Sequence, residues 1–201
     1  MLFRSSVVVN SVKKDGWAVL NAEDENCVEI SKELDCKVAF FSMDENHPVI
    51  SQHCKMGGIA AVYENGFITI KKGDWKIRVE KATHVPLTLN GKAKFMIANV
   101  LASTLASYLW GFKTEDIKLS LATFIPSAAQ TPGRMNIFNF KKFKVMIDFA
   151  HNPAGYLGVE EFLQSINSSH KIGIIAGVGD RRDNDIRDCA AIAARMFDHI
   201  I

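Results

Sequence analysis

TPGRMNIFNFKKFKVMIDFAHNPAG, residues 131–155, is the stretch that decides the fold. It contains a turn with one arginine, Arg134, then a short apolar strand, a polar break and a second apolar run. Asp148 lies within the second run, and His151 and Asn152 follow it directly. The proline that comes next has no backbone N–H, so it ends the strand and can open a helix. Because open α/β sheets bind ligands at the carboxyl ends of their strands, the pattern predicts a nucleotide-handling site at this edge.

The chain after this stretch alternates between helix and strand patterns. We expect helices over about 155–166 and 186–196, a strand of the fully buried type over 171–176, and another buried strand starting at 198–201. Strands that alternate with helices of this length predict parallel crossover units. The sequence therefore favours an α/β fold for the C-terminal part.

The chain before this stretch has a different organisation. Asn-Gly and Gly-Asp pairs separate three alternating runs, which predicts an antiparallel meander at the edge of the main sheet. The helix at 95–110 is apolar nearly all round, so we expect it to be buried. The best linker candidate is 127–131. The expected elements are strands at 6–9, 17–20 and 37–41, a short helix within 27–35, the meander runs at 59–63, 67–71 and 75–80, and helices at 95–110 and 114–123.

The composition is that of an ordinary globular protein and excludes several classes. Of 201 residues, 48% are hydrophobic and 23% are charged. The net charge of +2 gives no argument for binding nucleic acid or a membrane surface, and no apolar run approaches the roughly 20 residues that span a bilayer. The four cysteines lack metal-like spacing and no signal peptide is visible, which favours free thiols in a reducing compartment. We expect a cytoplasmic protein whose chain, by its two ends, reads as a fragment of a longer one.

Each candidate residue has a functional and a structural interpretation. The planar guanidinium of Arg134 suits phosphate, but it could be a surface arginine at a domain boundary. Asp148, in an apolar run, could accept hydrogen bonds from ribose hydroxyls or pair with an arginine. His151 could be a base or polar contact, or a structural residue. Asn99 lies in the helix expected to be buried, where an amide needs partners. The acidic cluster 23–25 could simply be a solvated helix start.

A glycine-containing turn, 177–182, is a second candidate site, because it follows an apolar strand and resembles a phosphate-cradling turn. Arg182 stands where the third glycine of GxGxxG would be, so the dinucleotide interpretation is weak. The chain contains no GxxxxGK[ST] loop. If the protein uses ATP, the loop that holds its phosphates therefore lies outside this chain.

Five motifs, taken together and in order, resemble the Mur ligase family. DFAHNP is similar to the family's D-Y-A-H-x-P signature, with Phe149 in place of tyrosine. The ordered set spans nearly all of the chain and is far more specific than any single motif. Within the family, the chain looks most like members that join arginine to the β-carboxyl of aspartate on a poly-aspartate backbone. The motifs are NAEDE at 21–25, FMIANVLA at 95–102, TPGRM at 131–135, DFAHNPAG at 148–155 and GDRRD at 179–183.

The resemblance implies a modular ligase. Residues 1–127 would be the C-terminal half of a central ATPase domain without its P-loop, and residues 128–201 a partial Rossmann-like C-terminal domain. Mur ligases phosphorylate a carboxylate with ATP and Mg²⁺, and an amine then attacks the acyl phosphate to form an amide. This fragment is therefore expected to be inactive alone, with most Mg²⁺ ligands outside it and no metal ligand assigned here. The full-length protein is expected to form a homo-oligomer.

The resemblance also assigns roles to individual residues. Those with a catalytic role would be Arg134, Asp148 and His151. Those at the nucleotide would be Asn99 at adenine, Arg134 at the phosphates and Asp148 at the ribose, with Asn21 and Asp24 of an N-x-D-D element nearby. Those near the incoming amino acid, arginine, and the acidic acceptor would be Asn152, Gly179, Asp180, Arg181 and Arg182.

Two groups of alternatives stay open. Folylpolyglutamate ligases and UDP-MurNAc-peptide ligases belong to the same class, and substrate assays on the full-length enzyme would separate them. A non-catalytic nucleotide- or partner-binding α/β module belongs to a different class. It would be favoured if the chain were stable and complete in its sheet at this length, whereas the ligase requires a phosphate-binding loop upstream.

Overall fold

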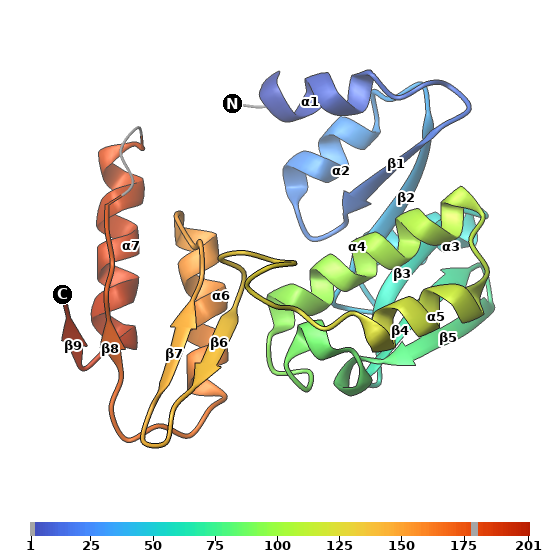
Figure 1. Ribbon diagram of the computed structural model, residues 1–201. Helices are drawn as coiled ribbons and strands as arrows, with labels where there is room; N and C mark the ends of the chain where they lie inside the picture. The colour runs from blue at the N-terminus through green and yellow to red at the C-terminus, as the bar shows by residue number, and fades with distance from the viewer. Residues whose placement is uncertain (1–2, 178–180) are drawn as a thin grey trace. The chain divides into compact units, whose positions relative to one another are not determined.

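The computed structural model describes residues 3–177 and 181–201. The chain folds into two compact units (Figure 1). Unit 1 comprises Met1–Gly91 with Phe95–Phe124, and unit 2 comprises Lys92–Lys94 with Ile125–Ile201. Both combine helices with strands, which confirms the α/β class.

Unit 1 is built on a five-stranded sheet with the order β1-β2-β3-β4-β5. The first three strands are parallel, and the last two continue as an antiparallel meander, as the hairpin signals predict. The meander therefore forms one edge of the sheet. The strands are β1 (Trp17–Asn21), β2 (Lys37–Ser42), β3 (Ile59–Glu64), β4 (Phe67–Lys72) and β5 (Trp75–Lys81).

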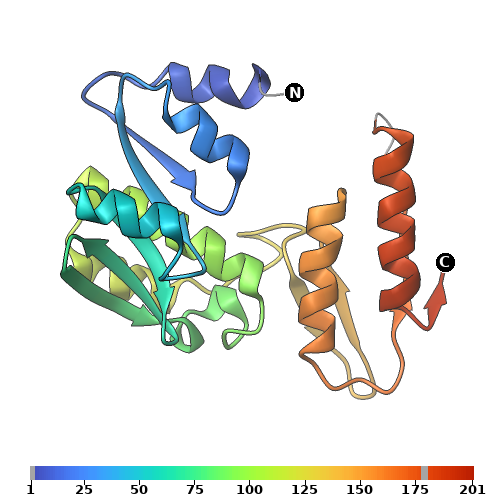
Figure 2. The ribbon, with the colours of Figure 1, turned by 180° about the vertical axis from the view of Figure 1, so that it is seen from behind.

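Helices cover both faces of this sheet (Figure 2). Side chains alternate between the faces, so Ala39 packs toward α4 while the neighbouring Phe40 packs toward α3. One face is covered by α1 (Phe3–Asn10), α2 (Glu25–Ser31) and α3 (Pro48–Lys55); the other is covered by α4 (Lys94–Trp110) and α5 (Thr114–Thr123), with the short 3₁₀ turns η1 (Ala82–His84) and η2 (Pro86–Thr88) beneath α4.

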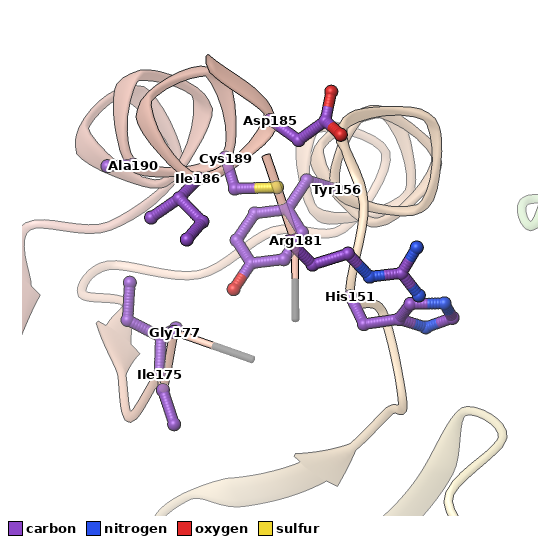
Figure 3. A pocket seen from close by; sticks show the side chains of 10 residues that line it. His151, Tyr156, Ile175, Gly177, Arg181, Asp185, Ile186, Cys189 and Ala190 are labelled. Atoms are coloured by element: carbon purple, nitrogen blue, oxygen red, sulfur yellow. The ribbon is translucent and has the colours of Figure 1, made fainter. Parts of the chain in front are cut away.

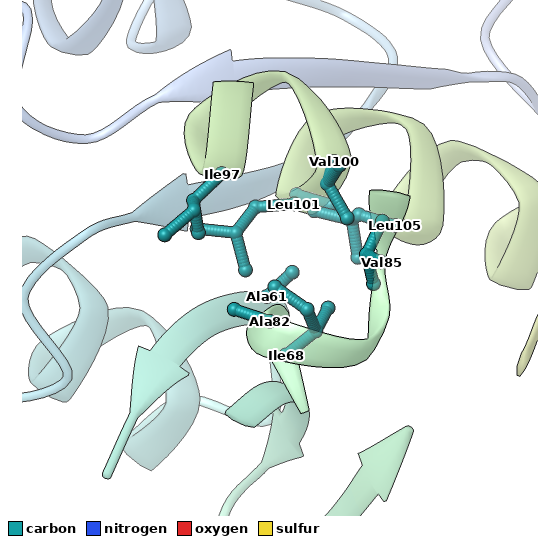
Figure 4. Close-up of a cluster of buried hydrophobic side chains, with 9 residues drawn as sticks. Ala61, Ile68, Ala82, Val85, Ile97, Val100, Leu101 and Leu105 are labelled. Carbon is teal, nitrogen blue, oxygen red and sulfur yellow. The ribbon is translucent and has the colours of Figure 1, made fainter. Parts of the chain in front are cut away.

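The main core of unit 1 lies under α4. Ile97, Leu101 and Leu105 of this helix are fully buried against Ala61 and Ile68 of the sheet (Figure 4). The expectation that α4 is well buried is correct for this stripe and wrong for the other side of the helix, because only the stripe faces the sheet. The opposite side reaches solvent, and that is where Asn99 lies.

Unit 2 contains a hairpin, two longer helices and a short parallel strand pair. The strands β6 (Asn136–Asn139) and β7 (Lys144–Ile147) are antiparallel, and β8 (Ile172–Gly173) and β9 (His199–Ile200) are parallel. The helices α6 (Pro153–Gln164) and α7 (Asp183–Met196) pack against each other and bury Phe162 and Met196. Arg195 of α7 forms a two-pronged ion pair with Glu160 of α6, with N–O distances of 3.2 Å.

Several expectations about local structure are wrong. Residues 6–9 were expected to form a strand but belong to helix α1. In the helix, Val9 packs against the core, whereas Val7 and Val8 face solvent. Helix α3 was not expected from the sequence. The strand expected at 171–176 covers only the two residues of β8, and the adjacent Ile174 is 82% exposed, because a single short strand pairs with β8. The terminal strand β9 was expected to be buried and is exposed.

Within the described residues, no helix combines the length and apolarity needed to cross a membrane. The four cysteines are free thiols.

Candidate functional site

The turn that carries Arg134 is held together by a buried amide. The side chain of Asn136 accepts a hydrogen bond from the Gly133 N–H (2.8 Å) and donates one to the Thr131 carbonyl (3.0 Å). Gly133 has φ +67°, a left-handed conformation that glycine adopts without strain. These constraints present the Arg134 side chain on an exposed, fixed turn.

The turn is also tied to the segment that follows β7. The backbone N–H of Phe149 donates to the Gly133 carbonyl (2.7 Å), and the Met135 N–H donates to Oδ2 of Asp148 (3.0 Å). The guanidinium of Arg134 lies 5.3 Å from the centre of the Phe149 ring, a cation–π contact. Arg134 and Asp148, far apart in sequence, are thus neighbours. A cation and a carboxylate presented together suit a ligand with both phosphate and hydroxyl groups.

His151 and Asn152 complete the end of this segment. Nδ1 of His151 lies 2.9 Å from the Phe149 carbonyl, which holds the ring in place and leaves Nε2 available. Asn152 caps α6, because its Oδ1 accepts from the Gly155 N–H (2.8 Å). Its position near a substrate stays a prediction, since its side-chain oxygen already has a structural partner.

A hollow of about 90 Å³ lies in unit 2, next to His151 (Figure 3). Tyr156 of α6 and the first two turns of α7 form its walls together with the end of the β8 segment. Its lining is mostly apolar with a few charged groups. The lining residues are His151, Tyr156, Ile175, Ala176, Gly177, Arg181, Asp185, Ile186, Cys189 and Ala190.

Burial raises the pKa of two groups that line this hollow, Tyr156 and Cys189. Burial raises the pKa of the Tyr156 hydroxyl, and the Cys189 thiol adds to this. Burial also raises the pKa of Cys189, and the carboxylates of Asp185 and Asp188 act in the same direction against the opposing charge of Arg181. Because the thiolate is the reactive form of cysteine, this raised pKa lowers the reactivity of Cys189.

The two arginines of the glycine turn have different surroundings. Arg181 lines the hollow. Arg182 instead pairs with Asp185, with Nε–Oδ2 and Nη2–Oδ1 distances of 3.0 Å each. The other two predicted residues of this turn, Gly179 and Asp180, lie outside the described residues.

The predicted nucleotide residues of unit 1 have mainly structural contacts. Asp24 caps α2, because its Oδ1 accepts from the N–H groups of Asn26 (2.8 Å) and Cys27 (3.2 Å). Asn21 accepts from the Glu23 N–H (3.0 Å). Both lie at the carboxyl end of β1, the edge where open sheets bind ligands.

Asn99 is exposed, so the expectation of a buried amide is wrong. Its Nδ2 lies 3.8 Å from the sulfur of Met96, a weak contact, and the amide is available to a ligand. The α4 stripe that packs on the sheet does not include it.

The structure therefore brings Arg134, Asp148 and His151 together, with Arg181 nearby in the same unit. Sequence reasoning missed several residues that organise or line the site. A buried polar residue at the start of a strand could have indicated Asn136, but nothing local indicates that one face of α6 and one of α7 share a hollow. The missed residues that organise or line the site are Asn136, Tyr156, Ile175, Asp185, Ile186 and Cys189.

Comparison with curated proteins identifies clear relatives, although no protein-family model matches the chain. The chain is 47% identical over 195 residues to the cyanophycin synthetase of Geminocystis herdmanii, covering 97% of this chain and 22% of that relative. It is 26% identical over 198 residues to the UDP-N-acetylmuramoyl-L-alanyl-D-glutamate–2,6-diaminopimelate ligase of Bacillus cereus, covering 94% of this chain and 35% of that relative. The chain thus spans about a fifth of the length of the cyanophycin synthetases that it matches.

Solved structures show the same fold. MurF from Acinetobacter baumannii matches with a TM-score of 0.66 and 15% identity, over 97% of this chain and 40% of that one. At this identity the match speaks for the fold alone. Together, the comparisons confirm the resemblance to the Mur ligase family that the ordered motifs indicate.

Proposed function

We propose that the protein containing this chain is an ATP-dependent amide ligase that joins arginine to the β-carboxyl of aspartate in a poly-aspartate acceptor. The observation that carries the proposal is the 47% identity to a cyanophycin synthetase over nearly the whole chain. Because the chain spans 22% of that relative, the activity is proposed for the full-length protein. A cytoplasmic location, where ATP and amino acids are available, belongs to the same proposal.

ATP with Mg²⁺ would supply the phosphoryl group that activates the acceptor carboxylate for attack by an amine. The Arg134 turn fits a phosphate, because the guanidinium is exposed and has no carboxylate partner among the described residues. Asp148 fits a ribose, because Oδ2 is used by the Met135 N–H while Oδ1 has no hydrogen bond to any residue described. The described part of the chain contains no group of three His, Cys, Asp or Glu that could hold a metal ion.

The remaining assignments follow from the resemblance of the motifs to those of the Mur ligase family. The exposed amide of Asn99 would contact adenine, with Asn21 and Asp24 near the nucleotide. His151, with Nε2 available, would lie beside the ribose. Arg181, in the hollow, would lie near the incoming amino acid with Asn152 and Arg182. Arg181 would attract the α-carboxylate, and the apolar walls would exclude water from the reacting groups.

The test is ATP-dependent phosphate release by the full-length protein with a β-Asp-Arg primer, aspartate and arginine. Arg134→Ala should lower kcat/KM for ATP about 100- to 1000-fold, the range for loss of one preorganised charge-stabilising group. Asp148→Asn should raise the KM for ATP roughly tenfold, because a hydrogen bond to a charged group is weakened. Arg187→Ala is the matched control, since Arg187 is an exposed arginine of α7 outside the hollow.

The outcome separates the candidate functions. Primer- and arginine-dependent release that both variants lose supports the ligase and its site. Phosphate release that does not depend on arginine but depends on another amino acid favours a different Mur-type ligase. The 26% identity to a diaminopimelate ligase is the observation that supports this alternative. No release under any condition would favour a nucleotide-binding module without catalysis.

A further inference from the structure

We infer that Asp185 selects arginine as the incoming amino acid by accepting its guanidinium in place of that of Arg182. This inference rests on the proposed function and names the residue that would give it specificity. Asp185 is the only carboxylate among the residues that line the hollow of the described unit 2.

The carboxylate of Asp185 already holds a guanidinium in the geometry that arginine recognition requires. Nε and Nη2 of Arg182 each lie 3.0 Å from a different oxygen of Asp185. Two parallel N–H···O bonds of this kind form only when a planar guanidinium meets a carboxylate edge to edge. Arg182 therefore shows how a second guanidinium would bind, and Asp185 presents its carboxylate from the first turn of α7.

The exposure of the two partners indicates that the pair can exchange. The side chain of Arg182 is 70% exposed, whereas that of Asp185 is 26% exposed. Exposed ion pairs three residues apart contribute little to stability, because water solvates the separated charges well. A guanidinium that arrives from the hollow side would replace a partner that is free to turn into solvent.

The rest of the hollow suits the other parts of an arginine molecule. Tyr156 and Ile186 provide apolar walls for the aliphatic stem, and Arg181 provides a cation for the α-carboxylate (Figure 3). Lysine would fit less well, because its ammonium is a point charge and cannot occupy both carboxylate oxygens through a planar fork. The lining would thus favour arginine over lysine through one carboxylate.

The competing interpretation is that Arg182 and Asp185 only stabilise the start of α7. Kinetics of the full-length protein separate the two. Asp185→Asn should raise the KM for arginine at least tenfold and reduce the preference for arginine over lysine, while the KM for ATP stays unchanged. Arg182→Ala should leave the KM for arginine equal or lower, because it removes a competitor. The matched control is Asp188→Asn, an exposed carboxylate one residue before Cys189 that does not line the hollow.

Calorimetric titration of L-arginine into the same variants provides a readout independent of turnover, and far-UV circular dichroism verifies that each variant is folded. A selective loss of arginine binding in Asp185→Asn supports the inference. Unchanged arginine binding in this variant, an equal loss in Asp188→Asn, or a raised KM in Arg182→Ala overturns it while leaving the proposed ligase intact. Wild-type turnover that never depends on arginine overturns both.

Discussion

Replacement of Asn136 by alanine tests whether one buried amide organises the turn that carries Arg134. The Asn136 side chain is 6% exposed and makes two short hydrogen bonds, to the Gly133 N–H and the Thr131 carbonyl. Each bond contributes about 1 kcal/mol net, so the variant should lose about 2 kcal/mol of stability in unit 2. With a urea dependence of about 1 kcal/mol per M for a unit of this size, the unfolding midpoint should fall by roughly 2 M.

The assay follows urea unfolding of the 201-residue chain by two signals. All three tryptophans, Trp17, Trp75 and Trp110, belong to unit 1, so their fluorescence serves as an internal reference, whereas circular dichroism at 222 nm also reports the helices of unit 2. We expect the dichroism transition to shift and the fluorescence transition to shift less. Asn139→Ala is the control, because Asn139 is an exposed residue of the same strand. Equal transitions for the two variants would refute the reasoning.

Two further predictions concern unit 1. Asp24→Ala should destabilise it by about 1 kcal/mol in tryptophan-monitored unfolding, because α2 loses its cap, whereas Glu25→Ala in the exposed first turn should not; equal effects would exclude a capping role. Burial lowers the pKa of His53, whose ring packs edge-on against Phe40, below its usual 6.5. The unfolded chain therefore binds this proton at higher pH than the folded one, so stability should be full above pH 6.5 and decrease as the pH falls toward the folded pKa. His53→Gln should flatten that part of the stability–pH curve, and an unchanged curve would contradict this account.

Most helices and strands of unit 1 could be predicted from local sequence signals. The Asn-Gly and Gly-Asp turns fixed the meander β3–β5, and the apolar run before Gly111 fixed α4. Residues 6–9 show the limit of this approach, since a β-branched run became part of helix α1. Asn99 shows another limit: an apolar sequence on all sides does not reveal which side the sheet will cover.

Only some residues of the candidate site could be predicted from the sequence. Arg134, Asp148 and His151 were indicated by the strand-end pattern and the ordered motifs. The hollow beside them was not, because Tyr156 and Asp185 come from two helices with no local signal of their contact. Asp24 was expected near the nucleotide. In the structure its side chain accepts hydrogen bonds from the start of α2, and its role in nucleotide binding stays a prediction.

The sequence by itself determined which residues could carry chemistry and that strands and helices alternate, because turn residues, proline and hydrophobic periodicity act over a few residues. Only the tertiary structure decided that Arg134 lies over Phe149 and beside Asp148, and that the carboxylate of Asp185 lines a hollow with Tyr156. These contacts join residues from different segments of the chain. Their geometry depends on how whole elements pack, and no short stretch of sequence specifies that packing.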